Sequence, residues 1–273
     1  EGRVDFFLSK FDTDGNLVWG LTWGSASRHI SGGLVALDQP GNIYCLGSFV
    51  DEIDLDPGPG TDNRVSNGLE DVFLSKFDPD GNLIWAKTWG GAGYECEAGI
   101  STDNSGNVYV TGIFAALADF DPGPGEDFHE AVGGDDVFAS KFDSNGNFLW
   151  ARTWGGPQND HDSEFHSWGI AADGSGNVYV CGGFRDQVDF DPGPGEDNHV
   201  SNGGCDVFLA RFDTDGTYQW VKTWGGTYND IAQAVAIDSM DNCYVHGGFF
   251  FTVDFNPGIG EDFQDGGADK SSF

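Results

Sequence analysis

The sequence predicts an all-β fold, a β-propeller of four-stranded antiparallel blades, from three observations. A stretch that first reads DFFLSKFDTDGNLVW occurs four times, and its copies begin at Asp5, Asp71, Asp136 and Asp206. A second stretch, of the type DNSGNVYVTGIF, lies between these copies and begins at Asp38, Asp103, Asp173 and Asp238. Both stretches are filled with β-branched and aromatic residues and lack helical periodicity, which favours strands. The chain therefore holds about four copies of a unit of roughly 67 residues.

Each unit is expected to form four strands. One set consists of ECEAGIST (95–102), NVYVTGIF (107–114), DVFLSKF (71–77) and NLIWAKTW (82–89), as first to fourth strand. The turns DNSGN and DPDGN join the first strand to the second and the third to the fourth, and such glycine turns are typical of hairpins. Four antiparallel strands repeated around an axis form a propeller blade, whereas stacking along a line would give a solenoid, the competing architecture.

The repeat phase predicts a single domain over 1–273. Its blades are expected at approximately 25–90, 91–155, 156–225 and 226–273, the last completed by 1–24. Residues 267–273 (GADKSSF) align with the start of the chain, so that Phe273 corresponds to Phe7. This phase match predicts a closing blade shared between the two termini, although a segment of a longer array would fit equally well.

Paired tryptophans mark the fourth strand of every unit. They are Trp19 and Trp23, Trp85 and Trp89, Trp150 and Trp154, and Trp220 and Trp224. Positions four apart on a strand share one face, so these indoles are expected to pack one blade against the next. The basic residues of the third strand are expected to pair with repeat aspartates; they are Lys10, Lys76, Lys141 and Arg211.

The charge balance limits the classes of partner. The chain has 45 Asp and Glu against 12 Lys and Arg, a formal net charge of −33. This excess argues against nucleic acid and anionic membranes and favours hard cations. No apolar run approaches the length of a transmembrane helix. The five cysteines form no Cys-x-x-Cys pair and fall at different repeat phases, so small buried thiols are expected rather than a disulfide framework or a zinc site.

Two stretches carry a family resemblance. WGGAGYECEAGISTDNSGNVYVTGIF, followed by GGDDVFASKFDSNGNFLWARTWGG, resembles the bacterial SBBP-type β-propeller repeat, and the resemblance extends over nearly the whole chain. It implies a secreted or cell-surface bacterial protein and no catalytic residues. The chain departs from that family between the second and third strands, where it carries an unusual Asp-x-Asp-Pro-Gly-Pro-Gly loop instead of a Ser/Thr- and Pro-rich one.

This loop is written four times, as VDFDPGPGED in its fullest form (188–197). The chain is extended before Pro192, so Asp189 and Asp191 are expected on one face and Phe190 on the other. Carboxylates and turn carbonyls are the ligands that Ca²⁺ prefers, more so than Mg²⁺, so the loops are expected to bind calcium. The predicted ligands are Asp54, Asp56 and Asp62; Asp119, Asp121 and Asp127; Asp189, Asp191 and Asp197; and Asp254, Asn256 and Asp262.

Other interpretations of the acidic motifs stay open. The decapeptides could be plain Asp-Pro-Gly turns whose carboxylates accept backbone N–H groups, and the site with Asn256 should bind calcium weakly or not at all. The FDTDGN-type stretches at Asp12, Asp78, Asp143 and Asp213 are interpreted as hairpin turns rather than calcium loops.

A long insertion interrupts the third unit at 155–168. It forms a possible recognition patch of Asp160, His161, Asp162, Glu164, His166 and Trp168. The alternative is a tolerated surface insertion in which Trp168 fills a local gap.

These observations predict a non-catalytic, extracellular, calcium-binding β-propeller. It would serve as a structural or interaction module of a bacterial cell-surface, adhesive or fibre-forming protein. Its expected partners are other copies of itself or surface proteins, with glycans as a further class and no nucleic acid. The alternative is a calcium-dependent glycan-binding module. A propeller glycosidase or lyase is less favoured, because an active site needs convergent, non-repeated polar residues.

Overall fold

The computed structural model describes residues 5–24, 30–157 and 168–266, with the backbone alone for 30–32. Every regular element in this part of the chain is a strand, and neighbouring strands of each sheet are antiparallel. The described residues therefore confirm the predicted all-β class, and they include no helix that could cross a membrane. We call each four-stranded repeat unit a blade.

The first complete blade has the strand order β3-β4-β7-β8. Its strands are β3 (Ile30–Leu37), β4 (Ile43–Phe49), β7 (Asp71–Phe77) and β8 (Leu83–Gly91). A small hairpin of β5 (Glu52–Asp54) and β6 (Asn63–Val65) lies between its second and third strands. In the register of this blade Tyr44 lies opposite Lys76, and Lys76 lies opposite Trp85.

The second and third blades repeat this order with longer middle strands. The second has β9 (Glu95–Thr102), β10 (Val108–Asp119), β11 (Phe128–Phe142) and β12 (Phe148–Trp154). The third has β13 (Gly169–Ala172), β14 (Val178–Asp189), β15 (Asn198–Phe212) and β16 (Tyr218–Trp224). Ala118 of β10 also pairs with Gly91 of β8, so the first two blades form one eight-stranded sheet. The predicted first, second, third and fourth strands are thus confirmed.

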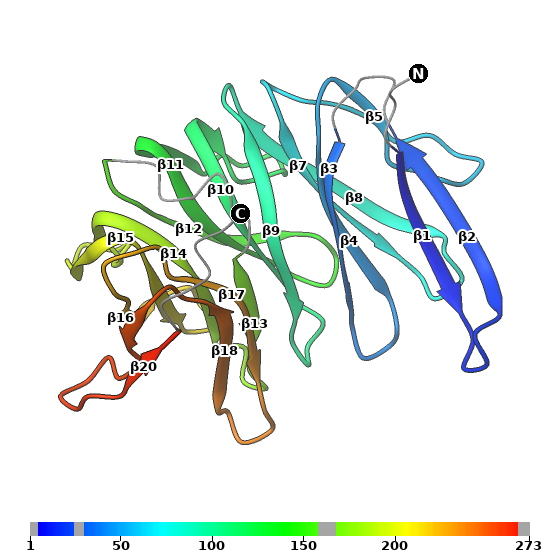
Figure 1. The fold of residues 1–273 in the computed structure, drawn as a ribbon. Helices are drawn as coiled ribbons and strands as arrows, with labels where there is room; N and C mark the ends of the chain where they lie inside the picture. The colour runs from blue at the N-terminus through cyan, green and yellow to red at the C-terminus, as the bar shows by residue number, and fades with distance from the viewer. Residues whose placement is uncertain (1–4, 25–29, 158–167, 267–273) are drawn as a thin grey trace, which may run out of the picture.

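Each end of the described chain carries half a blade. The N-terminal half is β1 (Asp5–Phe11) with β2 (Leu17–Gly24), and the C-terminal half is β17 (Ile231–Ile237) with β18 (Cys243–Gly248). The loop hairpin of β19 (Thr252–Asp254) and β20 (Phe263–Asp265) follows the C-terminal half. The halves lie at opposite ends of a curved row of sheets (Figure 1).

The predicted shared closing blade is not formed in this structure. Within the described ranges no strand pairing joins β1 or β2 to β17 or β18. Each half-blade packs one face against the adjacent complete blade. Phe6 of β1 packs edge-on against Phe73 of β7 at 5.0 Å between ring centroids. Ala232 of β17 is buried in a cluster with Val207 of β15.

The core lies between successive sheets and uses the second tryptophan of each pair. Trp89 packs on Phe142 of the next blade at 5.1 Å between ring centroids. The same contact joins Trp154 to Phe212 at 5.3 Å and Trp23 to Phe77 at 5.6 Å. The expectation that the tryptophans form blade interfaces is confirmed. The expectation of buried thiols holds for Cys45, Cys181 and Cys205, whereas Cys96 and Cys243 are only partly buried.

Basic residues of the third strand join the blades, but mainly through carbonyl groups. The ammonium of Lys76 donates to the carbonyl of Ser144 in the next blade at 2.9 Å, and that of Lys141 donates to Thr214 at 2.8 Å. Lys10 donates to the carbonyl of Pro79 in the same way. Pairing with a repeat aspartate is seen for Lys76, 3.4 Å from Asp38. The sequence did not reveal the carbonyl acceptors, because any residue type can supply them.

Candidate functional site

The acidic loops begin at a bend that every repeat makes at the same position. Two residues after the phenylalanine of each NVYVTGIF-type stretch, the backbone has positive φ; these residues are Asp51, Ala116, Asp186 and Phe251. In the second and third blades the middle strands shift register there and go on pairing, whereas in the first and last repeats a separate short hairpin follows. In the third blade the hydroxyl of Tyr218, at the start of β16, donates to Asp197 at 2.5 Å. The loop tip therefore lies against the outer strand.

The first aspartate of each loop closes it. One oxygen of Asp189 accepts the backbone N–H groups of Asp191 at 3.1 Å and Asp197 at 2.9 Å. The corresponding oxygens accept the same pair of N–H groups in the other three loops; they belong to Asp54, Asp119 and Asp254. A single carboxylate thus joins the two strands of the loop.

The second acidic position fills the loop interior. Asp191 accepts the N–H of Gly193 at 2.8 Å. A Cβ at Gly195 would lie 2.2 Å from the other oxygen of Asp191, so only glycine fits there. Asn256 accepts the N–H of Gly258 at 2.8 Å in the fourth loop, because this role needs an acceptor and not a charge. The repeated Pro-Gly-Pro-Gly is therefore explained as a rigid turn wrapped around one side chain.

The third aspartate pairs with the side chain two residues later. The guanidinium of Arg64 binds Asp62 at 2.7 Å, and His199 lies 3.1 Å from Asp197. His129 lies 3.4 Å from Asp127, and the amide of Gln264 donates to Asp262 at 2.8 Å. The residue between the first two acids anchors the first three loops, since Leu55, Phe120 and Phe190 are fully buried, whereas Phe255 of the fourth loop is 37% exposed.

The predicted calcium ligands thus already have partners in or beside their own loops. The first two acidic positions of each loop accept backbone N–H groups, and the third accepts a hydrogen bond in the first, third and fourth loops, whereas Asp127 lies 3.4 Å from His129. Among the described residues no group of three or more His, Cys, Asp or Glu has the arrangement of a metal site. The loop geometry matches the alternative interpretation, an Asp-Pro-Gly turn, and calcium binding stays a prediction from the sequence.

The predicted recognition patch is placed only in part. Asp160, His161, Asp162, Glu164 and His166 lie outside the described residues. Trp168 is 4% exposed and belongs to the hydrophobic cluster between the second and third blades. It lies against Gly182, where a Cβ would overlap the indole ring. Trp168 therefore packs as the gap-filling interpretation expected, and a recognition role for the insertion stays a prediction.

A groove of about 440 Å³ lies beside the third acidic loop. Residues Asp191–Gly195 form one wall, and His129, Arg152 and Tyr218 line the rest. Arg152 is fixed by donating to the carbonyl of Gly216 at 2.7 Å. Aromatic, cationic and carboxylate groups therefore border one polar groove at the edge of the third blade.

A cluster of buried acids, which the sequence analysis missed, lies where the first blade meets the second. The hydroxyl of Ser48 donates to Glu70 at 2.6 Å, and the thiol of Cys96 lies 3.6 Å from the other oxygen of Glu70. Glu95 is fully buried and accepts the N–H of Gly91 at 2.9 Å. Within the described part of the chain, one oxygen each of Glu95 and Glu97 is buried without a hydrogen-bond partner.

Burial keeps protons on this cluster. It raises the pKa of Glu95 to about 8, helped by the charges of Asp71 and Glu70, and it raises the pKa of Glu97 to about 8. The available sequence signal was that Glu97 interrupts the apolar pattern of the first strand, where the fourth repeat has Ala232. A buried carboxyl can hold a proton, but a general acid must also reach its substrate. We therefore regard the cluster as structural.

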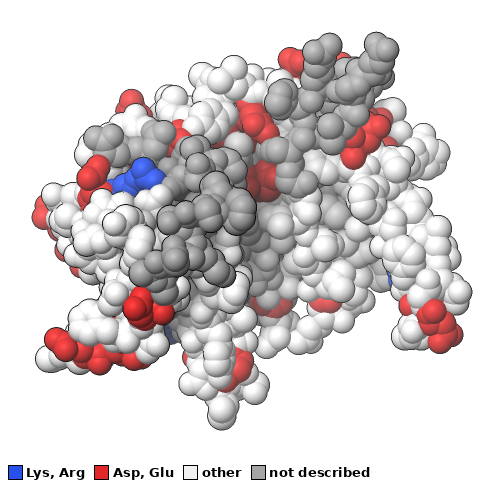
Figure 2. Space-filling view, viewed as in Figure 1, with Lys and Arg blue, Asp and Glu red and all other residues white. Residues whose placement is uncertain are grey.

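Acidic side chains also occupy the surface, where Figure 2 shows them at several hairpin tips with few basic groups nearby. The buried aspartate at the start of each DVFLSKF-type stretch is a different, repeated feature. Its Oδ2 accepts the backbone N–H of the residue four positions earlier, and burial raises its pKa to about 6 in three blades; these residues are Asp71, Asp136 and Asp206.

Comparison with known proteins gives distant relatives. No family model matches the chain. It is 27% identical over 205 residues to an uncharacterized WD repeat-containing protein, L264, of Acanthamoeba polyphaga mimivirus, covering 66% of this chain and 14% of that protein. It is 26% identical over 202 residues to the regulatory protein FlaEY of Caulobacter vibrioides, covering 72% of this chain and 20% of that protein. The chain thus spans a fifth or less of each relative.

Proposed function

We propose that this chain is a non-catalytic structural and interaction module whose blades belong to a β-propeller. The observation that carries the proposal is that each repeat uses the same polar side chains for the same internal bonds. The loop aspartates close their own loops, and the strand lysines bind the turn of the next blade. Side chains used in this way build a rigid scaffold rather than a reaction centre.

Two further observations support this proposal. The mimivirus relative is described as a WD-repeat protein, and WD repeats form propeller blades. The non-repeated acid cluster around Glu95 is buried, so a substrate could not reach it.

Hydrogen exchange in the presence of EGTA tests the rigid-module proposal. A preformed loop should protect the amides of Asp191, Gly193 and Asp197 to the same degree as amides at the strand ends, because each is bonded to a carboxylate. Exchange of these amides at the rate of an unstructured chain would contradict the proposal. Turnover of a glycan substrate would also contradict the proposal. Loss of that turnover in a variant lacking 158–164 would assign the activity to this insertion.

Calcium binding and an extracellular, cell-surface location form the part of the proposal that comes from the sequence. Calcium bound only by the folded chain should raise the thermal unfolding midpoint in calcium above that in magnesium or EGTA, with about three ions bound per chain. The three samples should have matched ionic strength, because screening alone stabilises an acidic protein. An unchanged midpoint with no bound metal would leave the loops as hydrogen-bonded turns.

A second candidate function is glycan binding, favoured by the groove beside Asp191. Tyr218 offers a ring for a sugar face, and Arg152 and His129 offer hydrogen-bond donors. A glycan array with and without calcium tests it. Binding that is lost in Arg152→Ala but kept in Lys222→Ala, an exposed position outside the groove, would support this function.

A further inference from the structure

The aspartate at the start of the DVFLSKF-type stretch has one buried oxygen without a partner in three repeats. Among the described residues, no group forms a hydrogen bond with Oδ1 of Asp71, Asp136 or Asp206. These residues are 1%, 3% and 1% exposed, and only their Oδ2 accepts a backbone N–H. A buried carboxylate oxygen that lacks a partner in the same place three times indicates a position where water or an ion binds.

A second buried acid faces this aspartate where the first blade meets the second. A Cβ on Gly90 would lie 2.6 Å from Oδ1 of Asp71 and 2.4 Å from Oε2 of Glu95, so the two carboxylates converge on one point. Glu95 is fully buried, and its Oε1 also has no hydrogen-bond partner in the described part of the chain. Asp71 begins β7 and Glu95 begins β9, so this pair lies at the joint between two blades.

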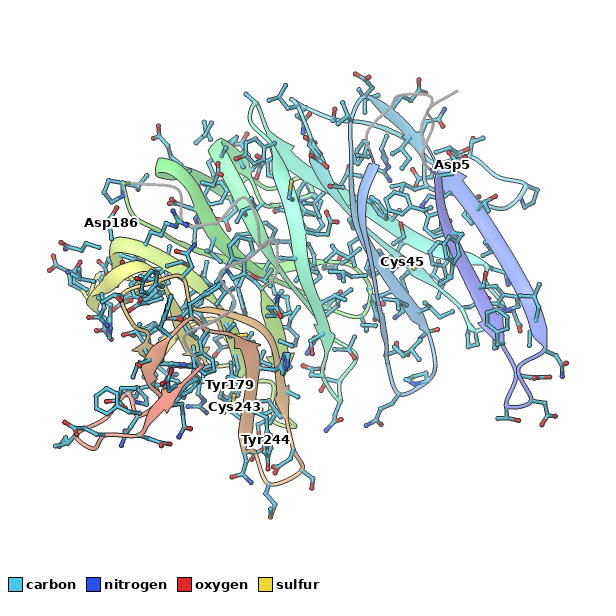
Figure 3. The ribbon with its side chains drawn as sticks, in the orientation of Figure 1. Asp5, Cys45, Tyr179, Asp186, Cys243 and Tyr244 are labelled. Carbon is cyan, nitrogen blue, oxygen red and sulfur yellow. The ribbon has the colours of Figure 1, made fainter. Side chains whose placement is uncertain are left out.

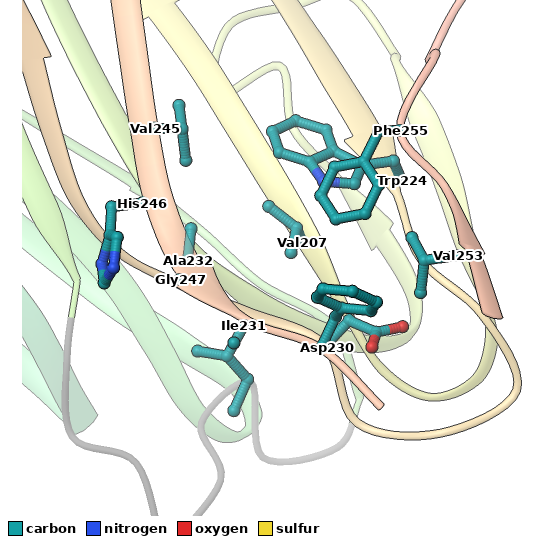
Figure 4. A pocket seen from close by; sticks show the side chains of 12 residues that line it. Val207, Trp224, Asp230, Ile231, Ala232, Val245, His246, Gly247, Val253 and Phe255 are labelled. Atoms are coloured by element: carbon teal, nitrogen blue, oxygen red, sulfur yellow. The ribbon is translucent and has the colours of Figure 1, made fainter. Parts of the chain in front are cut away.

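The same pair of acids recurs at the joint that follows the third blade. A Cβ on Gly225 would lie 2.4 Å from Oδ1 of Asp206. The next residue, Gly226, donates its N–H to the fully buried Asp230. Glu95 and Asp230 share one repeat position, six residues after the second tryptophan of the fourth strand. Figure 4 shows Asp230 at a mainly apolar pocket of about 260 Å³. We call the two pairs, Asp71 with Glu95 and Asp206 with Asp230, the joint acids.

The charges of the joint acids are not balanced by basic side chains. Within the ranges that the structure describes, none of the four carboxylates forms an ion pair with Lys, Arg or His. Two buried carboxylates side by side are unfavourable unless a proton or a cation lies between them. A proton neutralises one charge of a pair, whereas a divalent cation neutralises both. The joint acids therefore have the charge that a divalent cation requires.

We propose that each of these two joints binds one calcium ion between its joint acids. Ca²⁺ takes about six to eight oxygen ligands, and backbone carbonyls and water can complete the shell that two carboxylates begin. Because a pair supplies only two acidic side chains, such a site differs from the groups of three or more that the described residues lack. The ion would tie the third strand of one blade to the start of the next repeat, away from the acidic loops.

Calcium bound per chain after equilibrium dialysis tests the proposal on the whole chain. Asp71→Asn and Asp206→Asn should each lose about one tightly bound ion, because an amide does not replace the charge of the ligand. Asp5→Asn is the matched control. Asp5 begins the first copy of the stretch and faces Gly24, but it is exposed (Figure 3), and the sequence has His29 at the position of the second acid. Ions held by the acidic loops would remain in every variant. Equal calcium in the variants and the unmodified chain, or none in any, would overturn the proposal.

Amide exchange of the unmodified chain locates the ion even if a variant does not fold. Calcium should slow exchange at Asn67 and Gly91, whose N–H groups bond the first pair of joint acids, and at Gly226 in the second pair. Magnesium at equal concentration should do so much less, since it keeps its own waters. Slowing confined to loop amides such as Gly193, or no slowing at all, would show that the joint acids share only a proton or water. Because amide protection in EGTA tests the rigid module separately, the proposed function would survive either negative result.

Discussion

At the residue scale, the acidic decapeptide is a device for closing a loop. Asp189 bonds two amides, Asp191 fills the interior, and Asp197 binds His199. The four loops differ in sequence only where the replacement side chain can make the same hydrogen bond. Asn256 keeps an acceptor for Gly258, and Gln264 keeps a donor for Asp262. The repetition of the motif therefore follows from backbone geometry.

A glycine substitution tests this account of the loop. Gly195→Ala should lower the free energy of unfolding by about 1–3 kcal/mol, because its Cβ would lie 2.2 Å from Asp191 and force the carboxylate out of the loop. Urea unfolding measures the change. Gly174→Ala is the control, since its Cβ would make an ordinary contact and other repeats carry Gln39, Asn104 or Ser239 there. Equal effects of the two substitutions would contradict the account.

The buried glutamates predict an unusual pH dependence. Burial raises the pKa of Glu95 from 4.5 to about 8, so the folded chain keeps a proton that the unfolded chain releases. The stability should therefore fall as the pH rises from about 4.5 to about 8. Glu95→Gln, which is neutral at every pH, should flatten this slope and stabilise the protein at pH 8 by on the order of a few kcal/mol.

Denaturant titrations at pH 5, 6.5 and 8 measure this effect. Asp238 makes the stability change in the opposite direction at lower pH. The side-chain amide of Asn242 holds the pKa of Asp238 at about 2, so the stability that Asp238 contributes is lost as the pH falls from about 4 towards 2. A stability that rises between pH 5 and pH 8, or a slope that Glu95→Gln leaves unchanged, would show that the cluster is ionised in the folded protein.

At the element scale, each blade is fixed to the next through its third and fourth strands. Trp89 and Trp154 fill the apolar interface, and Lys76 and Lys141 cross it to a turn carbonyl. The turn that supplies this carbonyl is shaped by its own aspartate. Asp143 accepts the N–H groups of Asn145 and Asn147. The FDTDGN-type stretches were correctly interpreted as turns, and their position lets them receive the neighbouring lysine.

Removing one lysine tests the joint between blades. Lys76→Met should destabilise the protein by about 1–3 kcal/mol, because it removes a donor to Ser144 and leaves the buried Asp38 without its ion pair. Lys222→Met at an exposed position of β16 serves as the control and should change stability by less than about 0.5 kcal/mol. Urea unfolding compares the two variants. An unchanged midpoint for Lys76→Met would assign the joint to the aromatic contacts alone.

At the scale of the whole molecule, blades and half-blades form a row whose ends are unpaired in the described structure. The net charge of −33 acts on this row as a whole and repels its parts from one another. Sodium chloride should therefore raise the thermal unfolding midpoint steadily from low salt to about 0.5 M, since screening shortens the range of the repulsion. Potassium chloride should act equally, and a midpoint independent of salt would show that the acids are already compensated within their loops.

The sequence by itself determined the all-β class, the strands, the turns and the tryptophan interfaces. These features depend on residue type and spacing inside one repeat, and the pattern occurs four times. Trp168 shows the limit of this reasoning, because a residue outside the repeat pattern allowed both a recognition role and gap filling, and the structure alone places its ring against Gly182.

The tertiary structure alone decided which groups the polar side chains meet. Lys76 binds a carbonyl 68 residues away, and Glu70, Glu95 and Glu97 come together from different blades. It also decided that β1 and β18 lie apart, although their sequences would complete one blade. A repeat specifies which neighbour each strand can accept. Whether two such strands meet depends on the curvature of the whole row of sheets. This curvature results from packing between successive repeats and is not specified within a single repeat.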